Sequence, residues 1–173
     1  MNSQNFIFFM TIEVLLTGSF GVGKSSIFNR IIHDTFSSNY YGTMGVRVNE
    51  KVLEDQGITI KLWDIAGEIH QRKVPKIYFA KKTVILYIID ITRPFTFGSI
   101  LEDLQYLKEN VGEAIVKVIG NKKDLLTEAE LIKVQEEELP IVLQGIVSAK
   151  TGENLIALIN EVVEEARLKV KNN

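Results

Sequence analysis

Residues 18–25 read GSFGVGKS and combine three glycines with a lysine and a serine at a fixed spacing. The segment follows an apolar run and opens a run with helical spacing, which is the strand, loop and helix setting of a phosphate-binding loop. Backbone N–H groups of such a loop can surround a diphosphate, and the start of the following helix adds its positive dipole end. The competing interpretation is a glycine-rich turn with a solvent-exposed lysine.

Two side chains of this loop and one aspartate further on have the chemistry of a phosphate and metal site. Lys24 is expected to reach the β- and γ-phosphates, and the hydroxyl of Ser25 to ligate Mg²⁺, a cation that prefers oxygen. Asp64, in WDIAG, can hold the same metal through its water shell, and the N–H of Gly67 can approach a γ-phosphate because no side chain interferes. Taken alone, the DxxG pattern is weak, and Asp64 capping a turn is the alternative.

Residues 121–124 read NKKD and follow another apolar run. A carboxylate only accepts hydrogen bonds, and guanine offers two adjacent donors where adenine offers an acceptor and a bare C–H. Asp124 is therefore expected to select guanine, while Asn121 braces the loop and the stem of Lys122 covers the base. Alone, this run also fits a charged helix start.

A third loop, Ser148-Ala149-Lys150, follows the last apolar run. The N–H of Ala149 can donate to guanine O6, and the stem of Lys150 can pack on the nucleotide. Three residues prove little by themselves, so the value of this pattern lies in its place after the other two.

The elements that must position these loops are readable from apolar periodicity. Strand-like runs alternate with amphipathic helical runs, and two of the strands flank a turn signal at 54–57, which predicts an antiparallel hairpin. This alternation predicts a mostly parallel sheet covered on both faces, with ligands bound beyond the carboxyl ends of the strands. The predicted strands cover 11–16, 46–53, 58–63, 84–89, 116–119 and 141–147.

Helices are predicted from apolar faces and from one N-terminal cap. Thr127 followed by Glu130 fits a capping box. The apolar faces consist of Ile27, Phe28, Ile31 and Ile32 after Lys24, of Phe97, Ile100, Leu101, Leu104 and Leu107 in a middle helix, and of Leu155, Ile159, Val162, Val163 and Ala166 in the last helix.

Composition excludes several classes of protein. The 173 residues fit one domain, 1–173, and the net charge of −2 gives no electrostatic footprint for nucleic acid. The absence of cysteine excludes disulfides, thiolate metal sites and prenyl or palmitoyl anchors within this chain, so we expect a reducing, cytoplasmic compartment and no lipid anchor in this chain. The apolar start of about six residues is far shorter than the roughly 20 that cross a bilayer. We expect a monomer.

Taken together, GSFGVGKS, YYGTMGV, WDIAG, NKKD and SAKTGENL resemble the ordered motifs of the Ras-like small GTPases, over about residues 11–166. TMGV and SAKTGEN look most like the Rab branch, and the chain resembles a prokaryotic-type Rab-like GTPase. The resemblance implies an α/β three-layer P-loop GTPase (G domain) fold, with a six-stranded, mostly parallel sheet, one antiparallel strand and five helices. It also implies binding of GTP or GDP with Mg²⁺ and cycling between two states.

The resemblance assigns roles residue by residue. Thr43 matches the threonine that binds Mg²⁺ and the γ-phosphate, Phe36 the ring against guanine, and Tyr40 the tyrosine over the phosphates; without the resemblance, Phe36 is equally well read as a core residue. It implies effector, exchange-factor and activating-protein contacts through 36–50 and 65–80. The implied metal ligands are Ser25, Thr43 and Asp64, the catalytic residues Lys24, Thr43, Gly67 and Glu68, and the nucleotide-binding residues Ser19, Phe20, Gly21, Val22, Gly23, Lys24, Ser25, Ser26, Phe36, Tyr40, Thr43, Gly67, Asn121, Lys122, Asp124, Ser148, Ala149 and Lys150.

Two residues depart from the family pattern. Glu68 stands where relatives usually carry the glutamine that orients the attacking water, and an ionised carboxylate cannot donate a hydrogen bond. Phe20 stands where relatives usually carry a small residue, so its ring either crowds an approaching arginine finger or folds back onto the switch region. Slow intrinsic hydrolysis is the resulting expectation.

Three functions remain open at this point. The leading one is a GTP-hydrolysing molecular switch with slow intrinsic turnover. The second is a non-hydrolysing GTP-binding interaction module, which Glu68 and Phe20 favour. The third, a P-loop nucleotide kinase, shares only residues 18–25, lacks an arginine-rich lid and conflicts with Asp124.

Overall fold

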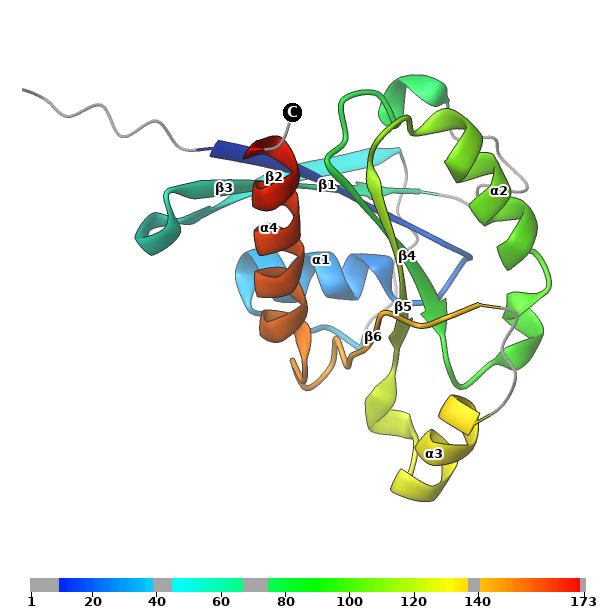
Figure 1. Cartoon of the computed structure of the whole chain (residues 1–173). Helices are drawn as coiled ribbons and strands as arrows, with labels where there is room; N and C mark the ends of the chain where they lie inside the picture. The colour runs from blue at the N-terminus through cyan, green and yellow to red at the C-terminus, as the bar shows by residue number, and fades with distance from the viewer. Residues whose placement is uncertain (1–9, 39–44, 67–74, 137–140, 172–173) are drawn as a thin grey trace, which may run out of the picture.

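The structure, a computed structural model, describes residues 10–38, 45–66, 75–136 and 141–171. Its centre is a six-stranded sheet in the order β2-β3-β1-β4-β5-β6 (Figure 1). β2 runs antiparallel to β3, and the other neighbouring pairs are parallel. The predicted sheet is therefore confirmed. The strands are β1 (Met10–Thr17), β2 (Val46–Leu53), β3 (Ile58–Ile65), β4 (Val84–Asp90), β5 (Ile115–Asn121) and β6 (Gly145–Ile146).

Four α-helices and four short 3₁₀-helices accompany the sheet within the described ranges. Five helices were expected, and the described part of the chain after β3 forms only a 3₁₀ turn before β4 begins; residues 67–74 lie outside the described residues. The helices are α1 (Lys24–His33), α2 (Ile100–Asn110), α3 (Glu128–Glu136), α4 (Leu155–Lys171), η1 (Glu54–Gln56), η2 (Lys76–Tyr78), η3 (Pro94–Phe97) and η4 (Lys123–Leu125).

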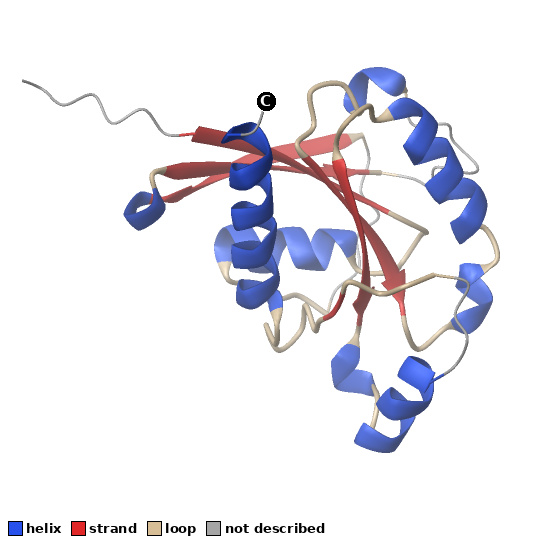
Figure 2. Cartoon of the chain, viewed as in Figure 1, coloured by secondary structure: helices blue, strands red, loops and turns tan. Residues whose placement is uncertain are grey.

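The helices form a layer on each face of the sheet, as Figures 1 and 2 show. α1 and α4 cover one face, and α2 covers the other. β4 contributes alternate residues to the two cores, since Val84, Leu86 and Ile88 lie in one apolar cluster and Ile85, Tyr87 and Ile89 in the other. All seven residues of β4 are buried for this reason. A strand covered on both faces reads as a continuous apolar run, which is why its sequence pattern is so clear.

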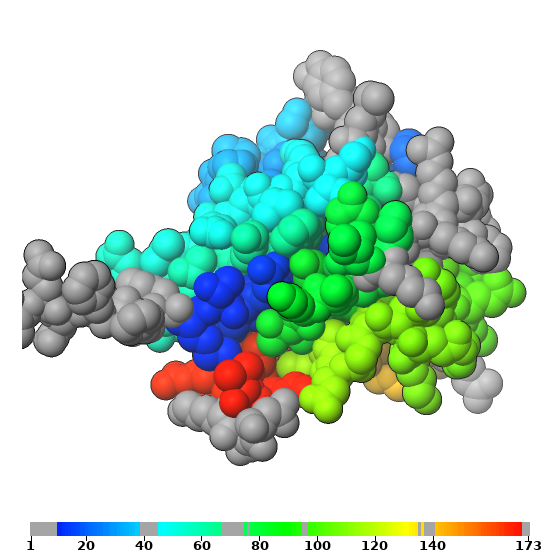
Figure 3. Space-filling model, turned by 90° about the horizontal axis from the view of Figure 1, so that it is seen from above, coloured from blue at the N-terminus to red at the C-terminus, as the bar shows by residue number. Residues whose placement is uncertain are grey.

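β2 is an edge strand and is the most exposed long strand of the sheet. Figure 3 shows the cyan segments of β2 and β3 at the surface, next to the blue start of β1. The outer side chains Val48 and Val52 expose 41% and 50% of their surface. Among the described residues, no helix is long and apolar enough to cross a lipid bilayer.

Two sequence predictions about elements are wrong. Leu101 exposes 55% of its surface and does not join the buried face of α2. That face is formed by Ile100, Leu104 and Leu107, which are spaced three or four residues apart and pack together with Phe97 of η3. The last strand was predicted over 141–147, but β6 has only two residues.

The shortness of β6 has a local cause. The side chain of Gln144 accepts a hydrogen bond from the N–H of Val118 at 2.6 Å, and the N–H of Gln144 donates to the carbonyl of Val118 at 2.9 Å. A side chain therefore replaces the backbone partner that an extended strand would supply to β5 at this position.

Candidate functional site

The loop between β1 and α1 approaches two neighbouring strands closely. Gly18, Gly21 and Gly23 all have positive φ angles, of 127°, 73° and 101°. A Cβ atom at Gly18 would lie 2.1 Å from the carbonyl oxygen of Ile88, and one at Gly23 would lie 2.2 Å from Nδ2 of Asn121. Both the backbone angles and the contacts therefore exclude a side chain at Gly18 and Gly23.

The loop leads directly into the N-terminus of α1. The N-cap Gly23 provides no side-chain hydrogen bond, and the first turn contains no acidic residue. The positive end of the helix dipole is therefore not neutralised by a local carboxylate in that turn. Val22 is fully buried in the core under α1 and fixes the loop to the sheet. This arrangement suits an anion such as a phosphate.

Lys24 folds back over the loop. Its Nζ donates to the carbonyl oxygens of Gly18 and Ser19, at 2.7 and 2.8 Å, and the residue is only 8% exposed. An ammonium group held in this position faces the same space as the loop amides. The predicted role of Lys24 toward phosphate oxygens fits this placement, since the ammonium can exchange a carbonyl partner for an anionic one.

Ser25 and Asp64 lie side by side, although 39 positions separate them in the sequence. The hydroxyl of Ser25 donates to Oδ2 of Asp64 at 2.7 Å. Asp64 is fully buried near the end of β3, and its Oδ1 has no hydrogen-bond partner among the residues that the structure describes. A buried, unsatisfied carboxylate oxygen is costly unless a cation or a metal-bound water completes it.

These oxygens fit a magnesium site. A hydroxyl and a carboxylate are ligands that Mg²⁺ prefers, and the remaining positions are usually taken by waters and phosphates. No cluster of three or more His, Cys, Asp or Glu side chains that could hold a metal occurs in the described part of the chain. A metal here would therefore depend on Ser25, on Asp64 and on oxygens of a bound ligand.

Asn121 connects two loops that are far apart in the sequence. Its Nδ2 donates to the carbonyl of Val22 at 2.9 Å, and its Oδ1 accepts from the N–H of Ala149 at 3.0 Å. Asn121 is 2% exposed, so both hydrogen bonds are shielded from water. The first and third sequence loops therefore meet at Asn121, and its predicted bracing role stays a prediction that these two hydrogen bonds support.

Asp124 is held by the third loop. Its Oδ1 accepts from the hydroxyl of Ser148 at 2.6 Å, and Nζ of Lys150 lies 3.7 Å from its Oδ2. The hydroxyl of Ser148 in turn accepts from the N–H of Thr151 at 3.1 Å. The carboxylate of Asp124 is thus held in place by the third loop with its side chain 11% exposed, as a selective acceptor must be.

Asp90, at the end of β4, was not identified from the sequence. It is fully buried and accepts from Nε of Arg93 at 2.6 Å and from Thr92, and Nζ of Lys122 lies 2.6 Å from its Oδ2. Burial raises the pKa of Asp90, but hydrogen bonds from Lys122, Thr92 and Arg93 outweigh it, so the pKa lies below its ordinary value. Asp90 pairs with Asn121 in the sheet and holds the ammonium group of Lys122 by an ion pair.

Arg30 is a second residue that the sequence patterns do not reveal. From the last turn of α1, its Nε donates to the carbonyl of Ala149 at 3.1 Å and its Nη2 to the carbonyl of Lys150 at 2.6 Å. These bonds attach the third loop to the helix that follows the first loop. A signal for Asp90 existed, since it is a polar residue where an apolar run ends, but nothing in the spacing marks Arg30.

The remaining predicted site residues have mixed outcomes. Phe20 and Phe36 expose 60% and 38% of their surface, so neither is a core residue. Ser26 lies in the first turn of α1. Tyr40, Thr43, Gly67 and Glu68 lie outside the described residues, and their roles stay predictions.

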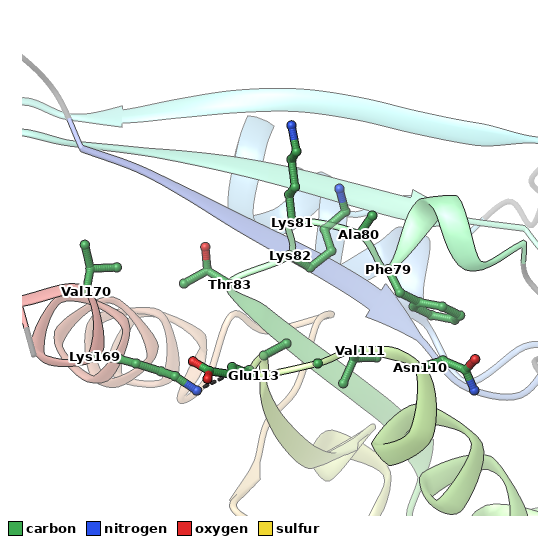
Figure 4. Close-up of a pocket in the computed structure, with 12 residues that line it drawn as sticks. Phe79, Ala80, Lys81, Lys82, Thr83, Asn110, Val111, Glu113, Lys169 and Val170 are labelled. Carbon is green, nitrogen blue, oxygen red and sulfur yellow. Dashed lines mark hydrogen bonds between the residues drawn. The ribbon is translucent and has the colours of Figure 1, made fainter. Parts of the chain in front are cut away.

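A separate cavity of about 430 Å³ lies at the amino ends of β4 and β5 (Figure 4). It is lined by the segment before β4, the segment before β5 and the end of α4, including Lys81, Lys82 and Lys169. Nζ of Lys169 donates to the carbonyl of Glu113, and Lys82 lies 3.4 Å from a carboxylate oxygen of Glu13. Because it lies at the amino ends of β4 and β5, this cavity is not part of the site at their carboxyl ends.

Comparison with known proteins gives a family match over nearly the whole chain. The model described as the Ras family matches residues 13–168, from β1 to α4. Ras-related protein RabC of Dictyostelium discoideum is 27% identical over 172 residues, which cover 93% of this chain and 86% of that protein. Ras-related protein Rab-12 of Homo sapiens is 28% identical over 173 residues, 94% and 71% of the two chains. Ras-related protein Rab-13 of Mesocricetus auratus is 29% identical over 164 residues, 91% and 80%.

Proposed function

The chain belongs to the Ras-like small GTPases, in the Rab branch, and from this premise we propose that it is a molecular switch that binds GTP and GDP with Mg²⁺ and hydrolyses GTP. The observation that carries the proposal is the pair of buried hydrogen bonds by which Asn121 joins the carbonyl of Val22 to the N–H of Ala149. They tie residues 18–25 to the loops after β5 and β6, which supports a nucleotide site shared by these loops.

Each group in the cleft has a task in this proposal. The loop amides and Lys24 bind the phosphates, and the carboxylate of Asp124 accepts from the two adjacent donors of guanine. Asp90 holds Lys122 so that its stem can lie against the base. When bound, Mg²⁺ would neutralise phosphate charge, and Ser25 and Asp64 are the described residues that would hold it. Thr43 is proposed as a further ligand in the GTP state.

We propose that intrinsic hydrolysis is slow because of Glu68. Its carboxylate cannot donate to the transition state, and two like charges near 4 Å cost up to ~4 kcal/mol at an effective dielectric constant of 20. If that penalty fell entirely on the barrier, hydrolysis would be slower by roughly 10³. Single-turnover rates of the native chain and Glu68→Gln test this: the variant should be faster, and a native rate equal to or above that of the variant contradicts the proposal.

Partners are expected at the surface near the phosphates. We propose that effectors, an exchange factor and an activating protein contact residues 36–50 and 65–80, where loss of the γ-phosphate would be sensed. Phe20 is 60% exposed, so an activating protein that reaches the phosphate-binding loop must approach around its ring. We further propose that the domain acts in the cytoplasm, where GTP is available and its chemistry needs no disulfide.

A non-hydrolysing GTP-binding module is the second candidate, and the exposed ring of Phe20 favours it because the ring obstructs an arginine finger. The two candidates differ in turnover and not in binding. Nucleotide analysis after incubation with GTP separates them: GDP accumulates with the switch, and GTP stays intact with the module. A chain that binds neither nucleotide contradicts both.

A further inference from the structure

Arg47 forms an ion pair with the same aspartate that the proposed metal site requires. Arg47 lies on β2 directly opposite Asp64 on β3 in the antiparallel register. Its Nη2 and Nε lie 2.6 and 3.3 Å from Oδ2 of Asp64, and both groups donate to that oxygen. The carboxylate is fully buried, whereas the side chain of Arg47 is 40% exposed.

The guanidinium group of Arg47 is held by α1 as well as by β3. The Cζ atom of Arg47 lies 4.7 Å from the centre of the ring of Phe28, which is a favourable cation–π distance. Its Nη1 donates to Oδ1 of Asn29 at 3.4 Å. Three elements therefore place the positive charge of Arg47 at the buried carboxylate, so the pair is more than a flexible surface contact.

Within the described part of the chain, the donors to Asp64 gather on one oxygen. Oδ2 accepts from Arg47 and from the hydroxyl of Ser25, while no described residue donates to Oδ1. A fully buried carboxylate needs a counter-charge. In this arrangement Arg47 supplies it, and the hydroxyl of Ser25 is already engaged with the carboxylate.

We propose that Arg47 is the built-in counter-ion of Asp64 in the metal-free protein and that Mg²⁺ binds in competition with it. The inference rests on the proposed function, because it assumes that Ser25 and Asp64 serve a nucleotide-bound metal. A guanidinium charge within a few ångströms of a divalent cation lowers the affinity for that cation by about tenfold even at the dielectric constant of water. Arg47 therefore weakens metal binding and gives the metal-free state a compensated carboxylate.

The position of Arg47 links metal occupancy to β2. Arg47 is the second residue of β2 and follows closely after residues 39–44, which contain Thr43. The N–H of Ala66, after β3, donates to the carbonyl of Gly45 at 2.8 Å and ties the start of β2 to the metal side of β3. Release of Arg47 from Asp64 would therefore change a side-chain contact at the start of β2 while the backbone tie to β3 remains.

The test measures how much Mg²⁺ is needed to slow the release of a fluorescent GDP from the purified protein. Replacing Arg47 by glutamine removes the charge and keeps a polar chain. We expect Arg47→Gln to lower the midpoint Mg²⁺ concentration by about tenfold or more. The matched control Arg167→Gln removes one arginine charge from the exposed side of α4 and should leave the midpoint unchanged.

Thermal unfolding of the GDP-bound protein gives a readout without turnover. Competition predicts that Arg47→Gln lowers the unfolding temperature in EDTA and that millimolar Mg²⁺ largely removes this difference. Equal destabilisation in both conditions, or an unchanged Mg²⁺ midpoint, overturns the inference. If neither the native chain nor the variants bind GDP at saturating Mg²⁺, the proposed function fails first, so the two failures are distinguishable.

A second measurement does not depend on the folding of Arg47→Gln. In an NMR spectrum of the native GDP-bound chain, the Nε–H signal of Arg47 can be assigned by its absence in Arg47→Lys. Titration with Mg²⁺ should change the chemical shift of this signal and speed its hydrogen exchange with solvent, because the ion pair with Asp64 is broken. A signal that stays unchanged while Mg²⁺ slows GDP release contradicts the competition.

Discussion

Replacing Asn121 by alanine should uncouple the phosphate-binding loop from the third loop. The substitution removes two buried hydrogen bonds and leaves the carbonyl of Val22 and the N–H of Ala149 without the partners that they have in the structure. Each buried group left unsatisfied costs about 1–3 kcal/mol, so the total is about 2–6 kcal/mol. Part of this cost falls on folding and the rest on nucleotide binding, because the bound state needs both loops in place.

The assay for Asn121→Ala combines urea denaturation without nucleotide and calorimetry with GDP and Mg²⁺. We expect the losses in unfolding free energy and in binding free energy to sum to at least about 2 kcal/mol, which is about 30-fold if all of it appears in affinity. Asn49→Ala is the control, since Asn49 is exposed on β2 and its side chain accepts only from the adjacent N–H of Glu50. If Asn121→Ala matches the native chain in both assays, the reasoning about loop convergence is refuted.

Three further predictions concern the same cleft. Gly18→Ala should lower the unfolding free energy by more than about 4 kcal/mol, because its Cβ would meet the carbonyl of Ile88. The control Gly57→Ala, where a Cβ would meet open space, should lower it by about 1 kcal/mol. Equal midpoints of the two variants in urea denaturation would contradict this prediction. Asp90→Asn should cost about 2 kcal/mol at pH 7, since its two cation partners are about a third exposed. Because the folded pKa of Asp90 is depressed, this difference should shrink as pH falls below the ordinary value of 3.8, and a difference independent of pH would argue against it. Asp124→Asn should weaken GDP binding by up to about 10⁴ while sparing xanthosine diphosphate, and retained GDP affinity in calorimetry would exclude Asp124 as the base reader.

The sequence predicts the sheet well because burial on both faces imposes long apolar runs. β4, which is buried on both faces, differs from its predicted range by one residue. β2 is an exposed edge strand, and its predicted range of 46–53 is matched because the turn signal at 54–57 marks its end. β6 could not be predicted, since the side chain of Gln144 takes over a backbone partner and no periodicity shows that. Leu101 was assigned to the wrong face because an apolar residue beside a helical stripe looks the same as one within it.

The sequence allows a site residue to be predicted where its residue type and spacing suit one chemical role. The glycine loop, Asn121 and Asp124 lie at or just beyond the carboxyl ends of parallel strands, which is where ligands of such sheets bind, and their roles stay predictions. The sequence does mark Asp90 as a polar residue at the end of an apolar run, but only the structure shows its pairing with Lys122, and no motif marks Arg47, which pairs with Asp64. Such pairs join positions that only the sheet register brings together.

The central claim is that one cleft recognises both the phosphates and the guanine base. Isothermal titration of the native chain with GTP and with ATP, each with Mg²⁺, tests it most directly. We predict GTP affinity at least about 10⁴ times higher than ATP affinity, because adenine would face the carboxylate of Asp124 with an acceptor and a C–H in place of the two donors of guanine. Equal affinities for the two nucleotides, or no heat of binding with either, would contradict the account.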